Sequence, residues 1–198
     1  MKLGNKPMKR LSLYLFLLLF TLQTPSLADD ISDFQIEGMS VGDSLLDYFS
    51  ESEIEKILYP KSKKFARTFH KINNGIYERV RIHYKTKDKK FIIHGIGGLI
   101  YYPNNIEACH TKEKEIIKEL ESDFPSGRKD AQGKLIHKSD TTGKSTYTYT
   151  AFYFDNGTIS LECTDWSKNI TSEKGWTDSL GVMINTNEFV HWLRNEAR

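Results

Sequence analysis

The most informative segment of this sequence is Asn73-Asn74-Gly75-Ile76-Tyr77-Glu78-Arg79-Val80-Arg81-Ile82-His83-Tyr84-Lys85. Its first three residues favour a tight turn, because Asn and Gly tolerate positive φ angles. The next ten alternate between a face with Ile76, Val80, Ile82 and Tyr84 and a face with Tyr77, Arg79, Arg81 and His83. Such alternation is typical of a half-buried antiparallel strand. The segment therefore predicts a β-hairpin, whose first strand is Lys64–Ile72.

The sequence on both sides of this hairpin predicts a mixture of strands and helices. Before it we expect two short capped helices between residues 40 and 58. After it we expect a strand at 91–102, a helix at 106–124, a short strand at 135–138, a second Asn-Gly hairpin at 146–166, a strand at 179–184 and a terminal helix from Thr186; residues 125–134 and 167–175 are expected to be loops. The fold class is α+β, with one antiparallel sheet of about six to seven strands and helices packed on one face. The order of elements also suggests a duplicated βββα unit.

Residues 1–28 have the features of a cleavable signal peptide. They carry four basic and no acidic groups, then a 12-residue apolar core at 11–22, then the small-residue site Ser26-Leu27-Ala28. That core is too short to span a bilayer. The full chain has 28 basic and 26 acidic groups, so residues 29–198 keep 24 basic against 26 acidic groups and a net charge of −2. We therefore expect a single secreted α+β domain at 29–198, in the periplasm or outside the cell, with no transmembrane segment after cleavage and no affinity for nucleic acid.

Both cysteines, Cys109 and Cys163, lie in the exported part of the chain. In an oxidising compartment the simplest expectation is one disulfide between them. The alternatives are two buried thiols or a catalytic cysteine. Catalysis is disfavoured because His110 follows Cys109 directly, and neighbours on a helix point in different directions.

Aromatic side chains are the first candidates for binding. Tyr147, Tyr149 and Tyr153 share one face of the strand 146–154, and tyrosine supplies rigid, amphipathic contact area. The alternative is that these tyrosines stabilise the sheet by cross-strand pairing or fill the core beneath a helix.

Basic side chains are the second candidates. Arg79 and Arg81 share a strand face and could meet an acidic partner, although such a face is more often simply solvated. His94 lies among apolar residues in a strand expected to be central, where a hydrogen-bonded structural histidine is the more common role.

Motifs for catalysis or cofactor binding are missing from the sequence. Gly143-Lys144-Ser145-Thr146 lacks the partner glycine of a phosphate loop and precedes a strand, and Gly95-Ile96-Gly97-Gly98 lacks the third glycine of a dinucleotide fingerprint. No histidine pair has zinc-ligand spacing, and no nucleophile elbow is present. The sequence therefore predicts no catalytic residue, no metal and no cofactor.

Ile36-Glu37-Gly38-Met39-Ser40-Val41-Gly42-Asp43-Ser44-Leu45-Leu46 resembles the Gly-Met-Ser/Thr helix start of the SmpA/OmlA outer-membrane assembly lipoproteins, which have a β-lactamase-inhibitor-like fold. This resemblance implies two short helices before antiparallel strands, in a unit that can be duplicated. It implies no functional residue. The sequence as a whole is also similar in character to small uncharacterised exported bacterial proteins.

These features favour a non-catalytic binding or interaction module of the periplasm or cell envelope. Its partner would be a protein or an envelope component, bound through one sheet face or the strand-loop tips. A small-ligand or lipid-binding domain, or a hydrolase with a dispersed site around His94, are the alternatives.

Overall fold

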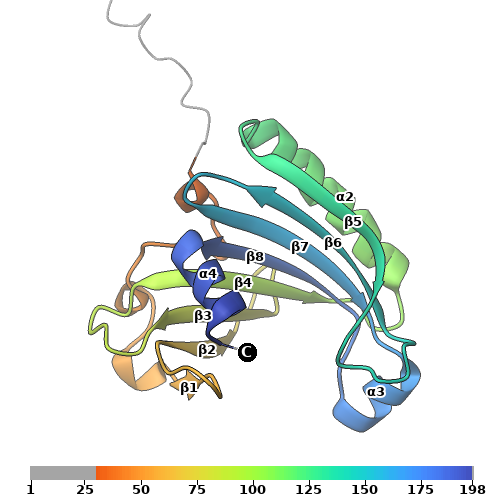
Figure 1. The fold of residues 1–198 in the computed structure, drawn as a ribbon, viewed down its shortest axis with the longest axis horizontal. Coiled ribbons are helices and arrows are strands. Elements are labelled where there is room, and N and C mark those ends of the chain that lie inside the picture. The colour runs from red at the N-terminus through yellow and green to blue at the C-terminus, as the bar shows by residue number, and fades with distance from the viewer. Residues whose placement is uncertain (1–29, 198) are drawn as a thin grey trace, which may run out of the picture.

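The computed structural model describes residues 30–197, and the predicted signal peptide lies outside the described residues. An eight-stranded antiparallel sheet forms the body of the molecule (Figure 1). The strands are β1 (Ile57–Leu58), β2 (Phe65–Lys71), β3 (Arg79–Lys85), β4 (Ile93–Tyr101), β5 (Arg128–Ile136), β6 (Thr146–Tyr153), β7 (Gly157–Asp165) and β8 (Ser179–Thr186). The helices are α2 (Ile106–Asp123), α3 (Lys168–Lys174) and α4 (Asn187–Asn195), with 3₁₀ turns η1 (Ile31–Asp33), η2 (Leu45–Asp47) and η3 (Glu51–Glu53). The α+β class is confirmed, whereas the predicted count of six to seven strands is too low.

The strand order is β1-β2-β3-β4-β8-β7-β6-β5. β8, the last strand of the chain, lies between β4 and β7, and it joins the two halves of the sheet. Consequently residues of β3 and β4 share a surface with residues of β6 and β7, which are far away in sequence.

The larger core lies on one face of the sheet, called here the back face. Val80, Ile82, Leu161 and Val182 are completely buried there. α2 covers the back of β7 and β8, and its fully buried Cys109 and Leu120 belong to this core. Asn105 caps the helix by accepting a hydrogen bond from the backbone N–H of Ala108. The rest of the back face is covered by the N-terminal segment, through the buried side chains of Ile31, Ile36, Met39, Val41, Leu45 and Ile54.

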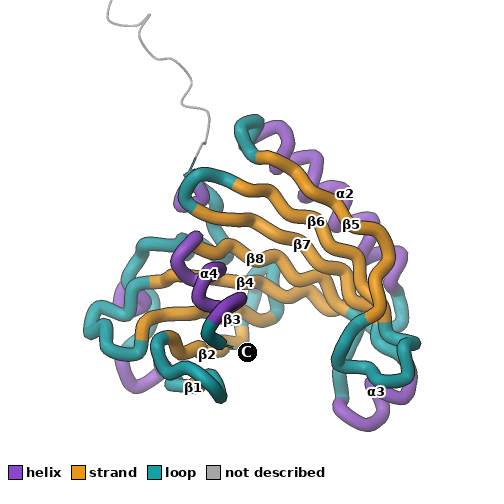
Figure 2. Tube along the Cα trace, in the orientation of Figure 1, coloured by secondary structure: helices purple, strands orange, loops and turns teal. Residues whose placement is uncertain are grey.

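α4 lies on the opposite face, called here the front face (Figures 1 and 2). Phe189 of α4 stacks on His83, with ring centroids 4.5 Å apart. His83 alternates along β3 with the back-face residues Val80, Ile82 and Tyr84, so it belongs to the front. The prediction that the helices pack on one face is therefore wrong. The reason is physical: the N-terminal segment already covers the back of β2–β4, and a second apolar cluster around Phe65 receives α4 on the front.

The βββα order occurs twice, as β2-β3-β4-α2 and as β6-β7-β8-α4, with α3 inserted before β8. The two closing helices nevertheless lie on opposite faces. A rotation about an axis normal to the sheet would keep both helices on one face, so it does not relate the two units.

Two segments expected to be loops are regular. β5 is an edge strand with most side chains exposed, so it lacks the apolar alternation that identifies strands. α3 has seven residues and buries only Ile170, which is too little for an apolar stripe. The two short helices expected at 40–58 are instead the 3₁₀ turns η2 and η3, and η3 begins with a capping box formed by Ser50 and Glu53.

The predicted disulfide joins Cys109 of α2 to Cys163 of β7, with Cα atoms 6.0 Å apart. It ties the helix on the back face to the second half of the sheet. Within residues 30–197 we find no helix that is both long enough and apolar enough to traverse a bilayer.

Candidate functional site

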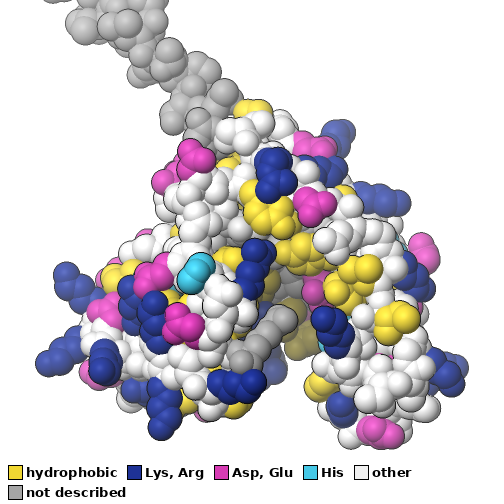
Figure 3. All heavy atoms as spheres, viewed as in Figure 1, with side chains coloured by type: hydrophobic (Ala, Val, Ile, Leu, Met, Phe, Trp, Pro, Cys, Tyr) yellow, Lys and Arg dark blue, Asp and Glu magenta, His cyan; other side chains and the backbone are white. Residues whose placement is uncertain are grey.

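The front face is hollowed between α4 and the end of the sheet that carries α3 (Figure 3). A cavity of about 220 Å³ lies in this hollow. We call the hollow and its cavity the front groove. The cavity is lined by residues from β3, β4, β6, β7 and β8 and by Trp166, which follows β7. The strand residues are Arg81, Leu99, Tyr149, Ser160, Glu162, Thr164, Ser179, Gly181 and Met183.

Gly181 keeps the floor of the cavity open. It lies on β8 between Glu162 of β7 and Leu99 of β4. A Cβ atom added to Gly181 would lie 3.5 Å from Leu99 Cδ2, which is an ordinary van der Waals contact. Neither backbone strain nor crowding therefore requires a glycine at this position. The missing side chain leaves free space above the sheet.

Arg81 forms one wall of the cavity. Its Nη2 lies 3.2 Å from the sulfur of Met183, and a thioether is only a weak acceptor. Its Nε is buried and has no hydrogen-bond partner within the described residues. Burial lowers the pKa of Arg81, the positive charge of Arg67 acts in the same direction, and Glu162 opposes the change. An arginine stays protonated even so, and the fold leaves this charge poorly compensated.

Two more arginines lie beside Arg81 on the front face. The guanidinium of Arg67 lies 5.3 Å from the ring centroid of Tyr59 and 5.8 Å from that of Phe69. Arg79 lies 5.0 Å from the same Phe69 ring. These cation–π contacts hold the planar groups against aromatic faces. In the part of the chain that the structure describes, no carboxylate forms an ion pair with any of the three arginines.

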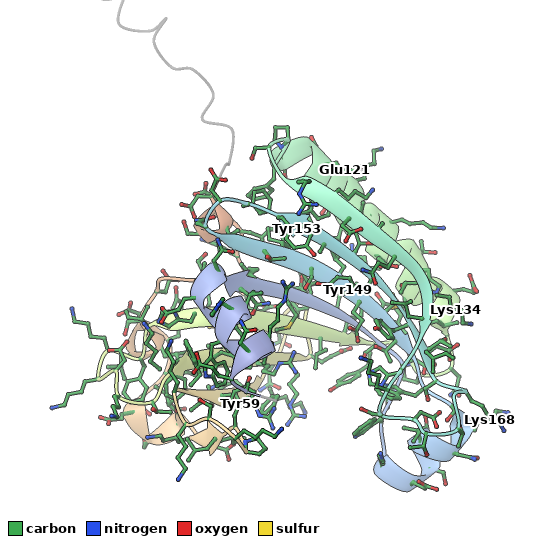
Figure 4. All side chains as sticks on the ribbon, in the orientation of Figure 1. Tyr59, Glu121, Lys134, Tyr149, Tyr153 and Lys168 are labelled. Atoms are coloured by element: carbon green, nitrogen blue, oxygen red, sulfur yellow. A yellow bond between two sulfur atoms is a disulfide. The ribbon has the colours of Figure 1, made fainter. Side chains whose placement is uncertain are left out.

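Aromatic rings form the opposite end of the groove. Trp166 packs on Trp176 and on His137, with centroid distances of 4.6 and 4.3 Å. His137 in turn meets the edge of Tyr147 at 5.6 Å. Tyr149 lies on β6 directly opposite Glu162, and burial raises its pKa. Tyr59 and Tyr149 lie on opposite sides of the groove (Figure 4).

Asp140 fixes the loop beneath this aromatic end. Its carboxylate accepts hydrogen bonds from the hydroxyls of Thr142, Ser145 and Ser167 at 2.6, 2.7 and 2.9 Å. Hydrogen bonds from Thr142 and Ser145 hold the pKa of Asp140 well below its usual range. Ser167 also caps α3, so the loop, the helix and Trp166 are held in one arrangement.

The wall formed by α4 is held by the second apolar cluster. Phe65, Phe189 and Trp192 are buried there. His83 is also fully buried, and its Nδ1 forms a 2.9 Å hydrogen bond with the hydroxyl of Tyr59. Burial keeps the pKa of His83 well below its ordinary value, so this ring is neutral near pH 7.

The structure brings only some of the predicted binding residues together. Arg81 and Tyr149 line the same cavity. Arg79 and Tyr147 do not line it, but they lie on the same face, opposite the cavity residues Leu99 and Thr164 of the neighbouring strands. Tyr153 contacts Arg128, whose guanidinium lies 4.6 Å from its ring. His94 lies outside the groove: its Nδ1 is 3.7 Å from Glu188 of α4, its ring meets the edge of Phe65, and burial lowers its pKa.

Several cavity residues were not expected from the sequence. They are Leu99, Glu162, Gly181 and Met183, together with the neighbouring Arg67 and Tyr59. Arg67 could have been found by continuing the alternation of the first hairpin back into β2. Leu99, Glu162, Gly181 and Met183 share one cavity because β8 lies between β4 and β7, which no local pattern shows.

One group of possible metal ligands, His110, Glu113 and Cys163, lies between α2 and β7. The sulfur of Cys163 is bonded to Cys109, so it cannot act as a thiolate ligand. Glu113 accepts a hydrogen bond from Thr148 at 3.1 Å, which satisfies it within the fold.

Larger hollows lie elsewhere on the surface. One, of about 620 Å³, lies between α2 and the N-terminal segment. Another, of about 690 Å³, lies around the β3–β4 turn and η3. Two more, of about 430 and 280 Å³, lie beside Lys85 and beside Asn104. None of them includes a buried charged atom without a partner among the described residues. The front groove is therefore the stronger candidate site.

No family, no curated protein and no solved structure matches this chain in the three comparisons with known proteins.

Proposed function

We propose that the protein is a non-catalytic binding module of the periplasm or cell envelope, which holds a partner protein or envelope component in its front groove. The observation that carries this proposal is the groove itself. Its concave surface combines aromatic rings with the guanidinium of Arg81, whose buried Nε has no acceptor within the described residues. Aromatic and arginine side chains are the residues that contribute most to protein interfaces.

The disulfide supports export. Structural disulfides form and persist in oxidising compartments and are rare in the cytosol. A bridge between α2 and β7 is therefore consistent with the signal peptide predicted for residues 1–28, and both features favour the periplasm or the cell exterior.

The positions of the histidines support binding rather than catalysis. His83 is buried beneath α4 and neutral, and His94 lies beside Glu188 outside the groove. His137 packs against Trp166 and Tyr147 as part of the aromatic wall. The hydrolase with a dispersed site around His94 thus gains no support from the geometry.

A small-ligand or lipid-binding domain is the second candidate. Pockets for whole ligands usually measure about 300–1,000 Å³, and the cavity in the front groove measures about 220 Å³. This volume suits one side chain or headgroup of a larger partner better than a complete lipid. The size of the cavity therefore favours a partner that inserts one group and lies along the open groove.

The test is affinity capture from native envelope extract with three forms of the protein. The Gly181→Leu variant fills the cavity, since the glycine Cβ position is free of close contacts. The Gly133→Leu variant is the matched control, because Gly133 is exposed on the edge strand β5 and a Cβ there meets nothing within 4 Å.

We expect the wild type and Gly133→Leu to retain the same stoichiometric partner and Gly181→Leu to lose it. Equal capture by all three forms would contradict binding through the groove. Recovery of a co-purifying small molecule instead of a partner would favour the second candidate.

A further inference from the structure

We propose that the front groove recognises the free carboxylate at the end of a peptide or protein chain whose last residue is apolar. This inference rests on the proposed function and names the chemical group that the groove holds. It depends on the charges and the shape of the cavity around Arg81.

The first step concerns the sign of the ligand's charge. Arg67, Arg79 and Arg81 lie side by side on β2 and β3, and none of them forms an ion pair within the described residues. The Nε atoms of Arg67 and Arg81 are both buried without an acceptor in residues 30–197. A buried cation without a partner is costly, and a bound anion removes that cost. The planar fork of a guanidinium fits the two oxygens of a carboxylate or phosphate.

The second step distinguishes a carboxylate from a phosphate. Glu162 lines the same cavity, and within residues 30–197 its carboxylate accepts a single hydrogen bond, from the hydroxyl of Thr164 at 2.9 Å. A fixed negative charge here disfavours a doubly charged phosphate. It is compatible with a singly charged carboxylate, and it can accept a hydrogen bond from the backbone N–H of a bound peptide.

The third step concerns the body of the ligand. Apolar surface comes from Leu99 and Met183, aromatic surface comes from Tyr149 and Trp166, and Gly181 leaves the floor open. The cavity of about 220 Å³ has room for one side chain, and it lies within the wider hollow of the front face (Figure 3). A terminal apolar residue in the cavity, with the preceding residues along the groove, satisfies both features.

The experiment titrates isotope-labelled full-length mature protein with pairs of N-acetylated tripeptides that end in leucine or phenylalanine. Within each pair, one peptide has a free carboxylate and the other a C-terminal amide. The amide resonances of Gly181 and Met183 report occupancy of the cavity, and this measurement detects affinities down to the millimolar range.

We expect the free acid to bind at least about tenfold more tightly than the amide, because hydrogen bonds from a guanidinium to a carboxylate are about twice as strong as those between neutral groups. The Arg81→Met variant should lose this preference. The Lys134→Met variant, which removes one positive charge from the exposed edge strand β5, should keep it.

Four results would overturn the inference. They are equal binding of acid and amide, an undiminished preference in Arg81→Met, tighter binding of phenyl phosphate than of the peptides, and equally tight binding of 3-phenylpropionate, which would identify a small acid as the ligand. If no peptide binds while capture from envelope extract still depends on Gly181, the carboxylate inference is wrong and the proposed function stands. If that capture is also absent, both are wrong.

Discussion

Replacing Arg81 with methionine should stabilise the protein. Arg81 contributes a buried Nε without an acceptor and a single weak contact from Nη2 to the sulfur of Met183. An unsatisfied buried donor costs about 1–3 kcal/mol, and apolar replacements of buried charged groups are often neutral or stabilising. We expect Arg81→Met to raise the free energy of unfolding by about 1–2 kcal/mol.

The assay is urea unfolding followed by tryptophan fluorescence, together with the thermal midpoint. For a domain of this size, 1 kcal/mol corresponds to about 2–4 °C, so the midpoint should rise by about 2–8 °C. Arg79→Met is the matched control. Arg79 is exposed and stacks on Phe69 at 5.0 Å, and loss of that contact should destabilise by about 0.5–1 kcal/mol.

A destabilisation of Arg81→Met by more than about 1 kcal/mol would refute this reasoning. It would mean that the guanidinium is well satisfied in the folded protein and that its charge is structural. A stabilised variant that no longer binds its partner would place Arg81 among the residues that proteins keep for function at a cost in stability.

Four further predictions concern stability. Replacing both Cys109 and Cys163 with alanine should lower the free energy of unfolding by about 4 kcal/mol, because the disulfide closes a loop of 54 residues in the unfolded chain. Thiol titration of the unfolded, unreduced wild type should find no free thiol, and two reactive thiols would contradict the disulfide. Gly181→Ala should be neutral or stabilising by up to about 1 kcal/mol in urea, since its Cβ has room and glycine weakens strands; a clear loss would show that the floor is crowded. The folded pKa of His83 lies well below its unfolded value of about 6.5, so the free energy of unfolding should fall as the pH drops below about 6.5. The slope should approach about 1.4 kcal/mol per pH unit in the wild type and should be absent in His83→Gln. Identical slopes in the two proteins would exclude a buried neutral ring. Asp140→Asn should be less stable than the wild type at pH 7. This difference should shrink progressively as the pH falls below about 4, where the unfolded carboxyl takes up a proton while the folded one stays ionised, and it should disappear only below the lowered folded pKa; a pH-independent difference would contradict the lowered pKa.

Much of the fold follows from local pattern. The helix predicted at 106–124 is α2, Ile106–Asp123, because a side-chain cap and an apolar stripe define its start and its buried face. The hairpin predicted around Asp155-Asn156-Gly157 is β6 and β7. The edge strand β5 and the short helix α3 were not predicted, because β5 has no buried face and α3 buries a single side chain.

The placement of α4 could not be read from the sequence. Its stripe of Phe189 and Trp192 shows that the helix is buried on one side, and it does not show which face of the sheet receives it. That choice depends on the N-terminal segment, which covers the back of β2–β4. A pattern within one helix carries no information about this competition.

The groove was predictable in its parts and unpredictable as a whole. Arg81 and Tyr149 stood out from strand alternation alone. They share one cavity because β8 enters the sheet between β4 and β7, and because Gly181 of that strand leaves the space open. His94 lies in the same sheet, yet its register places it beside α4.

The most direct test maps where the partner binds. The partner captured from envelope extract is added to isotope-labelled protein, and the amide resonances that shift are located on the structure. We predict that the shifts cluster on the front face, at Tyr149, Glu162, Gly181 and Met183. Shifts confined to α2 and the N-terminal segment on the back face would contradict binding in the front groove.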